Sequence, residues 1–129
     1  SDPIMDVIGY GEPVITKGLN MLYGPGNDLV SATALTAAGA HLILFTTGRG
    51  TPFGAPAPTM KLATNTPLAT NKSGWIDFNA GVVADGVKTL DEAAQDLMAL
   101  VLEVASGKKT KAEEKGFREI SIFKDGVVL

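Results

Sequence analysis

The sequence predicts an α/β fold, a Rossmann-like layered domain with a mostly parallel sheet and flanking helices. Three observations predict it. A glycine-rich turn at residues 24–26 separates a strand-like stretch from a helix-like one, residues 41–45 are apolar on both faces, and residues 90–105 are amphipathic at helical spacing. Strand, turn, helix and strand in this order indicate a βαβ unit, whose crossover we expect to be right-handed.

The composition excludes several classes of function. With 129 residues, 45% of them hydrophobic and a net charge of −3, the chain can form one domain over 1–129 and offers no basic surface to nucleic acid or anionic lipid. It has no cysteine and one histidine, which excludes a disulfide framework, a thiol nucleophile and an all-histidine metal site in one copy. No apolar run approaches membrane length, and we expect a cytoplasmic protein without a membrane partner.

The first half of the chain predicts strand, helix, strand and loop. Residues 19–23 are the first strand. Asn27 can cap a helix that ends at Gly39, and residues 41–45 form a strand that is covered on both sides and opens with a hydrogen-bonded structural His41. Residues 48–58 hold six glycines and prolines, which excludes regular structure, and a loop of this length is usually functional or disordered.

The second half predicts two short strands and a long helix. The strands lie at 59–64 and 75–78, with Trp75 in the core. The pair Thr89 and Glu92 has capping-box spacing at the start of a helix that runs to Gly107. The mixed charges at 108–115 indicate a solvated stretch, and 120–129 a hairpin or edge strand.

The turn at residues 24–29 admits three interpretations. Gly24 and Gly26 fit the start of a dinucleotide fingerprint, but Leu29 stands where a third glycine belongs and Asp28 puts a carboxylate where a pyrophosphate would sit. A plain turn with good helix capping explains the same residues. Asn27 and Asp28 could also border a site for a polar, metal-assisted ligand.

Arg49 is the most informative candidate. It lies between Gly48 and Gly50, just after the second predicted strand, at the edge where open α/β sheets bind ligands. Glycines on both sides permit close approach of a ligand, and a guanidinium can hold a carboxylate by two parallel hydrogen bonds. The alternative is an arginine that pairs with a neighbouring acidic residue and braces the loop.

Polar side chains also lie near the other predicted strand ends. Lys61, Asn65, Asp77 and Asn79 offer donors and acceptors for a polyhydroxylated substrate. Lys61 is a general base if desolvation lowers its pKa, or else a solvent-facing strand lysine. The two asparagines could equally serve local backbone in turns.

Several longer stretches resemble the galactarate/altronate dehydratase family. They are residues 24–30, Leu-Phe-Thr-Thr-Gly-Arg-Gly-Thr-Pro-Phe-Gly at 44–54, Pro-Thr-Met-Lys-Leu-Ala-Thr-Asn at 58–65 and Trp-Ile-Asp-Phe-Asn-Ala-Gly at 75–81. The similarity continues through 104–107 and 117–129. Thr51-Pro52, and Ala55 where galactarate-type members often have cysteine, resemble the altronate branch.

The resemblance implies the C-terminal domain of a longer enzyme, which matches a chain that starts with Ser1. The implied reaction is loss of water from D-altronate, giving 2-keto-3-deoxy-D-gluconate, with ferrous iron or a similar divalent cation. The candidate catalytic residues are Arg49, Lys61 and Asp77. The candidate substrate-binding residues are Asn27, Asp28, Thr46, Thr47, Gly48, Gly50, Thr51, Asn65 and Asn79.

The metal ligands implied here are oxygens, from Asp28 or Asp77, or from regions outside this chain. The expected partners are the sugar acid, the rest of the same enzyme and, as a possibility, a second copy. A non-catalytic nucleotide-binding or oligomerisation domain that uses the same turn is the alternative function.

Overall fold

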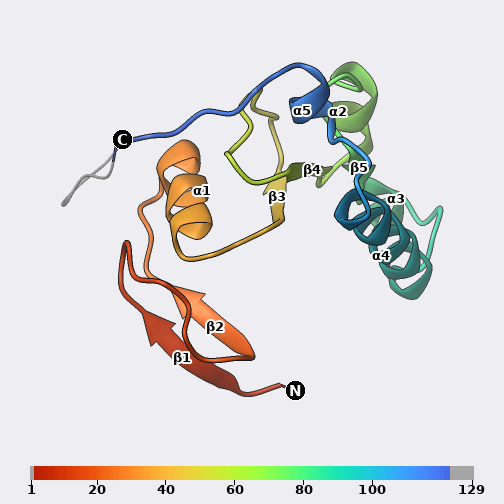
Figure 1. Cartoon of the computed structure of the whole chain (residues 1–129). Helices are drawn as coiled ribbons and strands as arrows, with labels where there is room; N and C mark the ends of the chain where they lie inside the picture. Colours follow the sequence, from red (N-terminus) through yellow and green to blue (C-terminus); the bar gives the residue numbers. More distant parts are fainter. Residues whose placement is uncertain (1, 123–129) are drawn as a thin grey trace.

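The computed structural model describes residues 2–122, which form both strands and helices (Figure 1). The strands are β1 (Ile4–Ile8), β2 (Leu19–Leu22), β3 (Ile43–Thr47), β4 (Thr59–Ala63) and β5 (Phe78–Asn79). The helices are α1 (Asp28–Ala37), α2 (Thr66–Asn71), α3 (Gly81–Ala84), α4 (Leu90–Ala105) and α5 (Lys111–Glu114). The predicted hairpin or edge strand at 120–129 lies outside the described residues from 123 onward, and residues 120–122 form neither helix nor strand.

All strand pairs of the described chain are parallel, and helices flank them, which confirms the predicted α/β class. The strands form two sheets rather than one: β1 pairs with β2, and the order in the other sheet is β3-β4-β5. The predicted βαβ unit is therefore wrong, because β2 and β3 do not share a sheet. The loop at 48–58 returns the chain to place β4 beside β3, while β2 finds its partner in β1.

Strand β3 is covered on one face only, which corrects the expectation of a strand buried on both sides. Ile43 and Phe45 pack into a core with Ala32 of α1 and Phe53 of the following loop. Leu44, on the other face, is 47% exposed. His41 is exposed and precedes the strand, so it is not a structural histidine within β3.

Strand β4 is the centre of the three-stranded sheet, and all five of its residues are buried. Met60 and Leu62 pack against Val104, Leu97 and their neighbours on α4. On the far side of β4, the residues 53–57 of the proline-rich loop are mostly buried and belong to the core. This loop is thus part of the packed layer, and it covers Lys61.

The predicted helix ends are confirmed. Asn27 caps α1 through Val30 N, and Gly39 adopts a φ of 108° just after it. Thr89 and Glu92 form both bonds of the capping box at α4. The expected strand at 75–78 is reduced to β5, and Trp75 is only partly buried. The charged stretch 108–115 contains α5, and Thr110, which caps this helix, is buried, so only part of the stretch is solvated.

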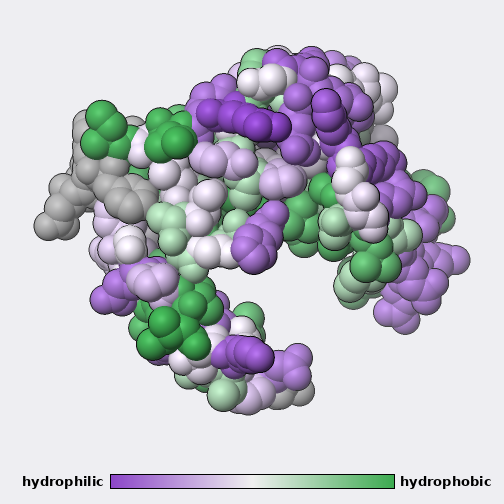
Figure 2. All heavy atoms as spheres, viewed as in Figure 1, coloured by the Kyte–Doolittle hydropathy of each residue, from purple (hydrophilic) through white to green (hydrophobic). Residues whose placement is uncertain are grey.

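The two sheets lie at opposite parts of an open arc (Figure 1). The space-filling view shows a hollow between the part that carries β1 and β2 and the part that carries α3 and α4 (Figure 2). Within residues 2–122, no helix is both long and apolar enough to cross a membrane.

Candidate functional site

The carboxyl ends of β3, β4 and β5 bring several predicted site residues to one edge. Thr64 N donates to Thr47 O at 3.0 Å, and Asn65 Nδ2 donates to Gly48 O at 3.1 Å. Asn79 Nδ2 reaches Thr66 Oγ1 at 3.0 Å. Because parallel strands end at one edge of a sheet, the three loops that follow them meet there, as the sequence predicts. Thr46 is exposed on β3 beside this edge.

Arg49 lies in the loop of this edge, which three bonds hold in place. Gly50 N donates to Thr47 Oγ1 at 2.9 Å, Lys72 Nζ donates to Arg49 O at 2.9 Å, and the third bond is the Asn65 contact with Gly48. Gly50 has a φ of 79°, a left-handed conformation that favours glycine. The backbone of Arg49 is thus fixed.

The side chain of Arg49 is exposed, and its guanidinium has no hydrogen-bond or ion-pair partner among residues 2–122. The alternative of a loop-bracing ion pair is therefore not what the described part of the chain shows. A guanidinium held on a fixed backbone and free of partners can receive a carboxylate from outside.

Asn65 and Asn79 both serve local backbone. Asn65 Oδ1 accepts from Leu68 N at 2.9 Å and caps α2, while Asn79 Oδ1 accepts from Gly81 N at 2.9 Å. A Cβ on Gly81 would come within 2.4 Å of Thr66 N, so the backbones there are in close contact. These asparagines shape the edge, and the amide groups that do so are already bonded.

Lys61 is buried, with 1% of its surface exposed, although a lysine in an alternating strand would ordinarily face solvent. Its Nζ donates to Thr51 O and lies 5.1 Å from the centre of the Phe53 ring. Burial lowers the pKa of the amine, and the charges of Asp77 and Glu119 oppose this effect. The amine is thus enclosed beneath the loop at 51–53.

Asp77 binds backbone with both carboxylate oxygens. Its Oδ2 accepts from Lys61 N at 2.8 Å, and its Oδ1 accepts from Lys111 N at 2.9 Å. The carboxylate therefore joins β4 to the start of α5. This geometry is that of a structural clamp next to Lys61.

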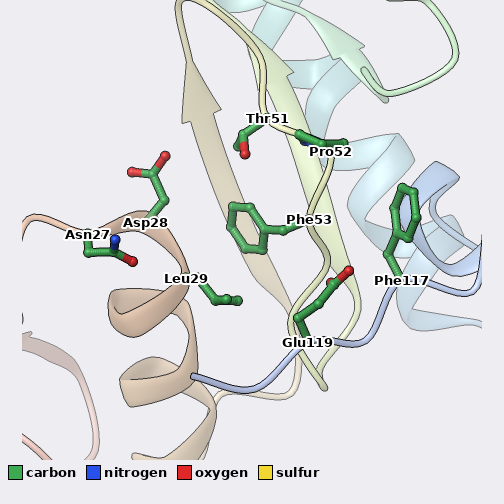
Figure 3. A pocket seen from close by; sticks show the side chains of 8 residues that line it. All are labelled: Asn27, Asp28, Leu29, Thr51, Pro52, Phe53, Phe117 and Glu119. Carbon is green, nitrogen blue, oxygen red and sulfur yellow. The ribbon is translucent and has the colours of Figure 1, made fainter. Parts of the chain in front are cut away.

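A pocket of about 430 Å³ lies between the start of α1 and the loop at 51–53 (Figure 3). Three of its lining residues, Asn27, Asp28 and Thr51, are predicted site residues, so the structure brings the turn and the loop together. The others are Leu29, Pro52, Phe53, Phe117 and Glu119. Figure 3 shows Phe53 in the middle of this group.

Phe117 and Glu119 are the pocket residues that sequence reasoning missed. Glu119 forms two hydrogen bonds with Gly54: Glu119 N donates to Gly54 O at 2.7 Å, and Glu119 Oε2 accepts from Gly54 N at 2.9 Å. A Cβ on Gly54 would come within 2.6 Å of Phe117 O. No local signal marks this contact, because 65 residues separate the partners.

The charges around the pocket are negative. Asp28 and Glu119 line it, and no lysine or arginine among residues 2–122 does. Asn27 Oδ1 is used to accept from Val30 N at 3.2 Å, which is the plain capping role. Negative charge at the pocket disfavours an anionic ligand there, a pyrophosphate included, whereas the guanidinium of Arg49 favours one.

The described residues do not fit a divalent cation by themselves. Within 2–122, no group of three or more His, Cys, Asp or Glu side chains could hold a metal ion. Both oxygens of Asp77 already accept backbone N–H groups, and among the described lining residues of its pocket Asp28 has only Glu119 as a second carboxylate.

Comparison with known proteins gives a family match over nearly the whole chain. Residues 1–128 match the model of D-galactarate/Altronate dehydratase, C-terminal. The chain is 50% identical over 127 residues to altronate dehydratase of Bacillus subtilis, covering 98% of this chain and 26% of that protein. It is 48% identical over 129 residues to altronate dehydratase of Escherichia coli, covering 100% of this chain and again 26% of the relative.

A more distant relative is galactarate dehydratase (L-threo-forming) of Escherichia coli, 41% identical over 107 residues, which are 82% of this chain and 20% of that protein. The chain thus spans about a quarter or less of the length of these curated relatives.

Proposed function

The chain belongs to the D-galactarate/altronate dehydratase family, of which it matches the C-terminal domain, and from this premise we propose that it works as part of a sugar-acid dehydratase. The proposed reaction is the loss of water from D-altronate to give 2-keto-3-deoxy-D-gluconate. The high identity to two altronate dehydratases supports this substrate over galactarate.

One observation carries the role of this domain: the guanidinium of Arg49 is exposed on a fixed loop at the carboxyl edge of the sheet, without a partner in the described chain. We propose that this guanidinium binds the carboxylate of the sugar acid. Thr47 and Thr46 stand beside it as polar groups for the substrate hydroxyls.

The chemistry explains why this contact matters for rate. A proton next to a carboxylate is weakly acidic, and its removal places negative charge on that carboxylate before the 3-hydroxyl leaves with a proton. A guanidinium that already binds both carboxylate oxygens stabilises this charge as it develops. Such electrostatic stabilisation is worth about 10²–10³ in turnover per donor group.

Lys61 and Asp77 enter this proposal as positioning residues. Lys61 holds the loop at 51–53 through Thr51 O, and Asp77 fixes the backbone of Lys61. The enclosed amine does not reach solvent, and so it does not reach substrate at the edge. We place the ligands of the divalent cation implied by the family in the rest of the enzyme, and no step proposed here uses a metal held by this domain.

The test is Arg49→Ala in the intact enzyme, with D-altronate as substrate. We expect kcat/KM to fall roughly 10²–10³-fold, with Arg49→Lys partly active because it restores charge without the planar fork. Lys109→Ala is the control, since Lys109 is also an exposed cation and lies between α4 and α5 rather than in the loops of this edge. Near-normal turnover of Arg49→Ala, with an unchanged Tm, would remove Arg49 from the mechanism.

A further inference from the structure

The sheet of β1 and β2 stands without the cover that parallel sheets normally have. It consists of two strands, so each strand has one edge without a strand partner in the described chain. Parallel sheets are found almost only with both faces buried, and two strands alone are marginal in water. Something must compensate for this arrangement.

The two faces of this sheet differ. On the inner face, Ile8 and Leu22 lie opposite Leu35 and Ala38 around a cavity of about 250 Å³ next to α1. On the outer face, Val7 and Met21 are register partners and are 70% and 53% exposed. Leu19, two positions before Met21, and its register partner Ile4 are also exposed, at 53% and 54%. Met5 lies in the β-bulge beside Gly18, at the margin of this face, and is 51% exposed.

The outer face (Ile4, Val7, Leu19 and Met21) carries no charge. The one charged residue of the two strands, Asp6, is the register partner of Asn20 and belongs to the inner side. Edges and faces meant for water usually carry lysine or other charges, which also prevents aggregation. A contiguous apolar face without charge resembles a permanent interface rather than a free surface.

We propose that the outer face of β1–β2 is an interdomain surface, covered by the part of the enzyme that lies outside residues 1–129. The chain spans only 26% of the length of its altronate dehydratase relatives, so in an enzyme built as they are, a partner larger than this domain accompanies every copy. That partner is present at fixed stoichiometry, which suits an apolar face that cannot safely be left open. A second copy of the chain is the competing occupant.

The four methionines of the chain allow a direct test by oxidative footprinting of the intact native enzyme. Met21 reports on the outer face and Met5 on its margin. Met60 is fully buried and gives the slowest oxidation rate to be expected, and the urea-unfolded enzyme gives the fastest. We expect Met5 and Met21 to oxidise roughly tenfold or more slowly than in the unfolded enzyme, close to Met60. Oxidation of both at near the unfolded rate would overturn the proposal.

The occupant is identified by incorporating photo-methionine and mapping crosslinks from position 21. Crosslinks to peptides outside residues 1–129 support the proposal. A crosslink that joins two Met21 peptides would assign the face to a second copy and overturn it.

Two valines with equal exposure provide matched variants. Val7 on the outer face and Val87 after α3 are both 70% exposed in this domain. In the intact enzyme, we expect Val7→Lys to lower the Tm and to speed the oxidation of Met21, and Val87→Lys to do neither. Equal behaviour of the two variants would contradict a covered outer face, and if Val7→Lys does not fold, the wild-type footprint still decides.

Discussion

Two side chains, those of Lys61 and Asp77, link the core to the candidate site through bonds to the backbone. Lys61 Nζ donates to Thr51 O in the loop. The carboxylate of Asp77 accepts from Lys61 N with one oxygen and from Lys111 N with the other. The loop beside the pocket, the central strand and the start of α5 therefore share one set of polar contacts. Changes at these residues should act on stability first and on turnover through it.

Substitutions of Asp77 test whether its carboxylate acts in structure or in catalysis. Hydrogen bonds to a charged group contribute about 1.5–3 kcal/mol each, so we expect Asp77→Ala to lower the free energy of unfolding by about 3 kcal/mol and Asp77→Asn, which keeps one acceptor, by about half of that. Urea unfolding measures both. A large loss of turnover in Asp77→Asn at unchanged stability would instead return Asp77 to the reaction.

The burial of Lys61 predicts that the free energy of unfolding depends on pH in a definite direction. Burial lowers the pKa of the Lys61 amine in the folded chain below the usual 10.5. At a pH between these two pKa values, the amine is protonated in the unfolded chain and neutral in the folded chain. In that window the contribution of Lys61 to stability increases as the pH rises. The free energy of unfolding of the wild type relative to Lys61→Met should therefore be higher at about pH 9.5 than at about pH 7.

Urea titrations of both proteins at the two pH values test this difference, in which the titration of all other lysines and tyrosines cancels. A difference that stays constant or falls with pH would show that the amine is not desolvated. The sequence could not predict this burial: Met60-Lys61-Leu62 alternates, and the residues that enclose Lys61 come from the loop at 51–53. The location of Arg49 in the loop after a strand, in contrast, was predictable, because it follows from the local sequence, whereas its role stays a prediction.

Helix ends were the most predictable elements, because capping involves residues three apart. Thr89 and Glu92 fulfil the expected box, and Thr110 and Glu113 repeat it at α5, where the charge pattern suggested only a solvated stretch. Strand pairing was less predictable, since it depends on distant partners. Nothing local to 19–23 and 41–45 indicates that β2 and β3 join different sheets.

The two capping boxes predict different losses from the same substitution. Thr89 is exposed, so Thr89→Ala should lower the free energy of unfolding by about 1 kcal/mol, the usual value of a cap. Thr110 is 1% exposed, and its loss also leaves a small void, so Thr110→Ala should reach about 2 kcal/mol.

Urea unfolding of the two variants, with Gln95→Ala in the middle of α4 as an exposed control, measures the difference. Equal losses at the two positions would mean that burial at Thr110 adds nothing to its capping role.

At the scale of the molecule, packing is concentrated around one of the two sheets. Two core clusters pack on β3 and β4, from α1 with the loop at 53–57 and from α4, and a third cluster joins Ala63 to Leu68 and Ile76. Of β1 and β2, only Ile8 is buried. The candidate site therefore stands on the well-packed sheet, whereas the other sheet depends on what covers it.

This division predicts how hydrogen exchange differs between residues 1–129 alone and the intact enzyme. Amides of β4 exchange only when the core opens, so we expect strong and equal protection in both proteins. Amides of β2 bond to a single exposed partner strand, so in the domain alone they should exchange much faster than those of β4. If the outer face is covered in the intact enzyme, exchange of the β2 amides should be markedly slower there. Mass spectrometry of peptides covering 19–23 and 59–63 reads out both sheets in one experiment. Protection of β2 equal to that of β4 in the domain alone would show that two strands and α1 suffice, and that the exposed apolar face has no stabilising partner to lose.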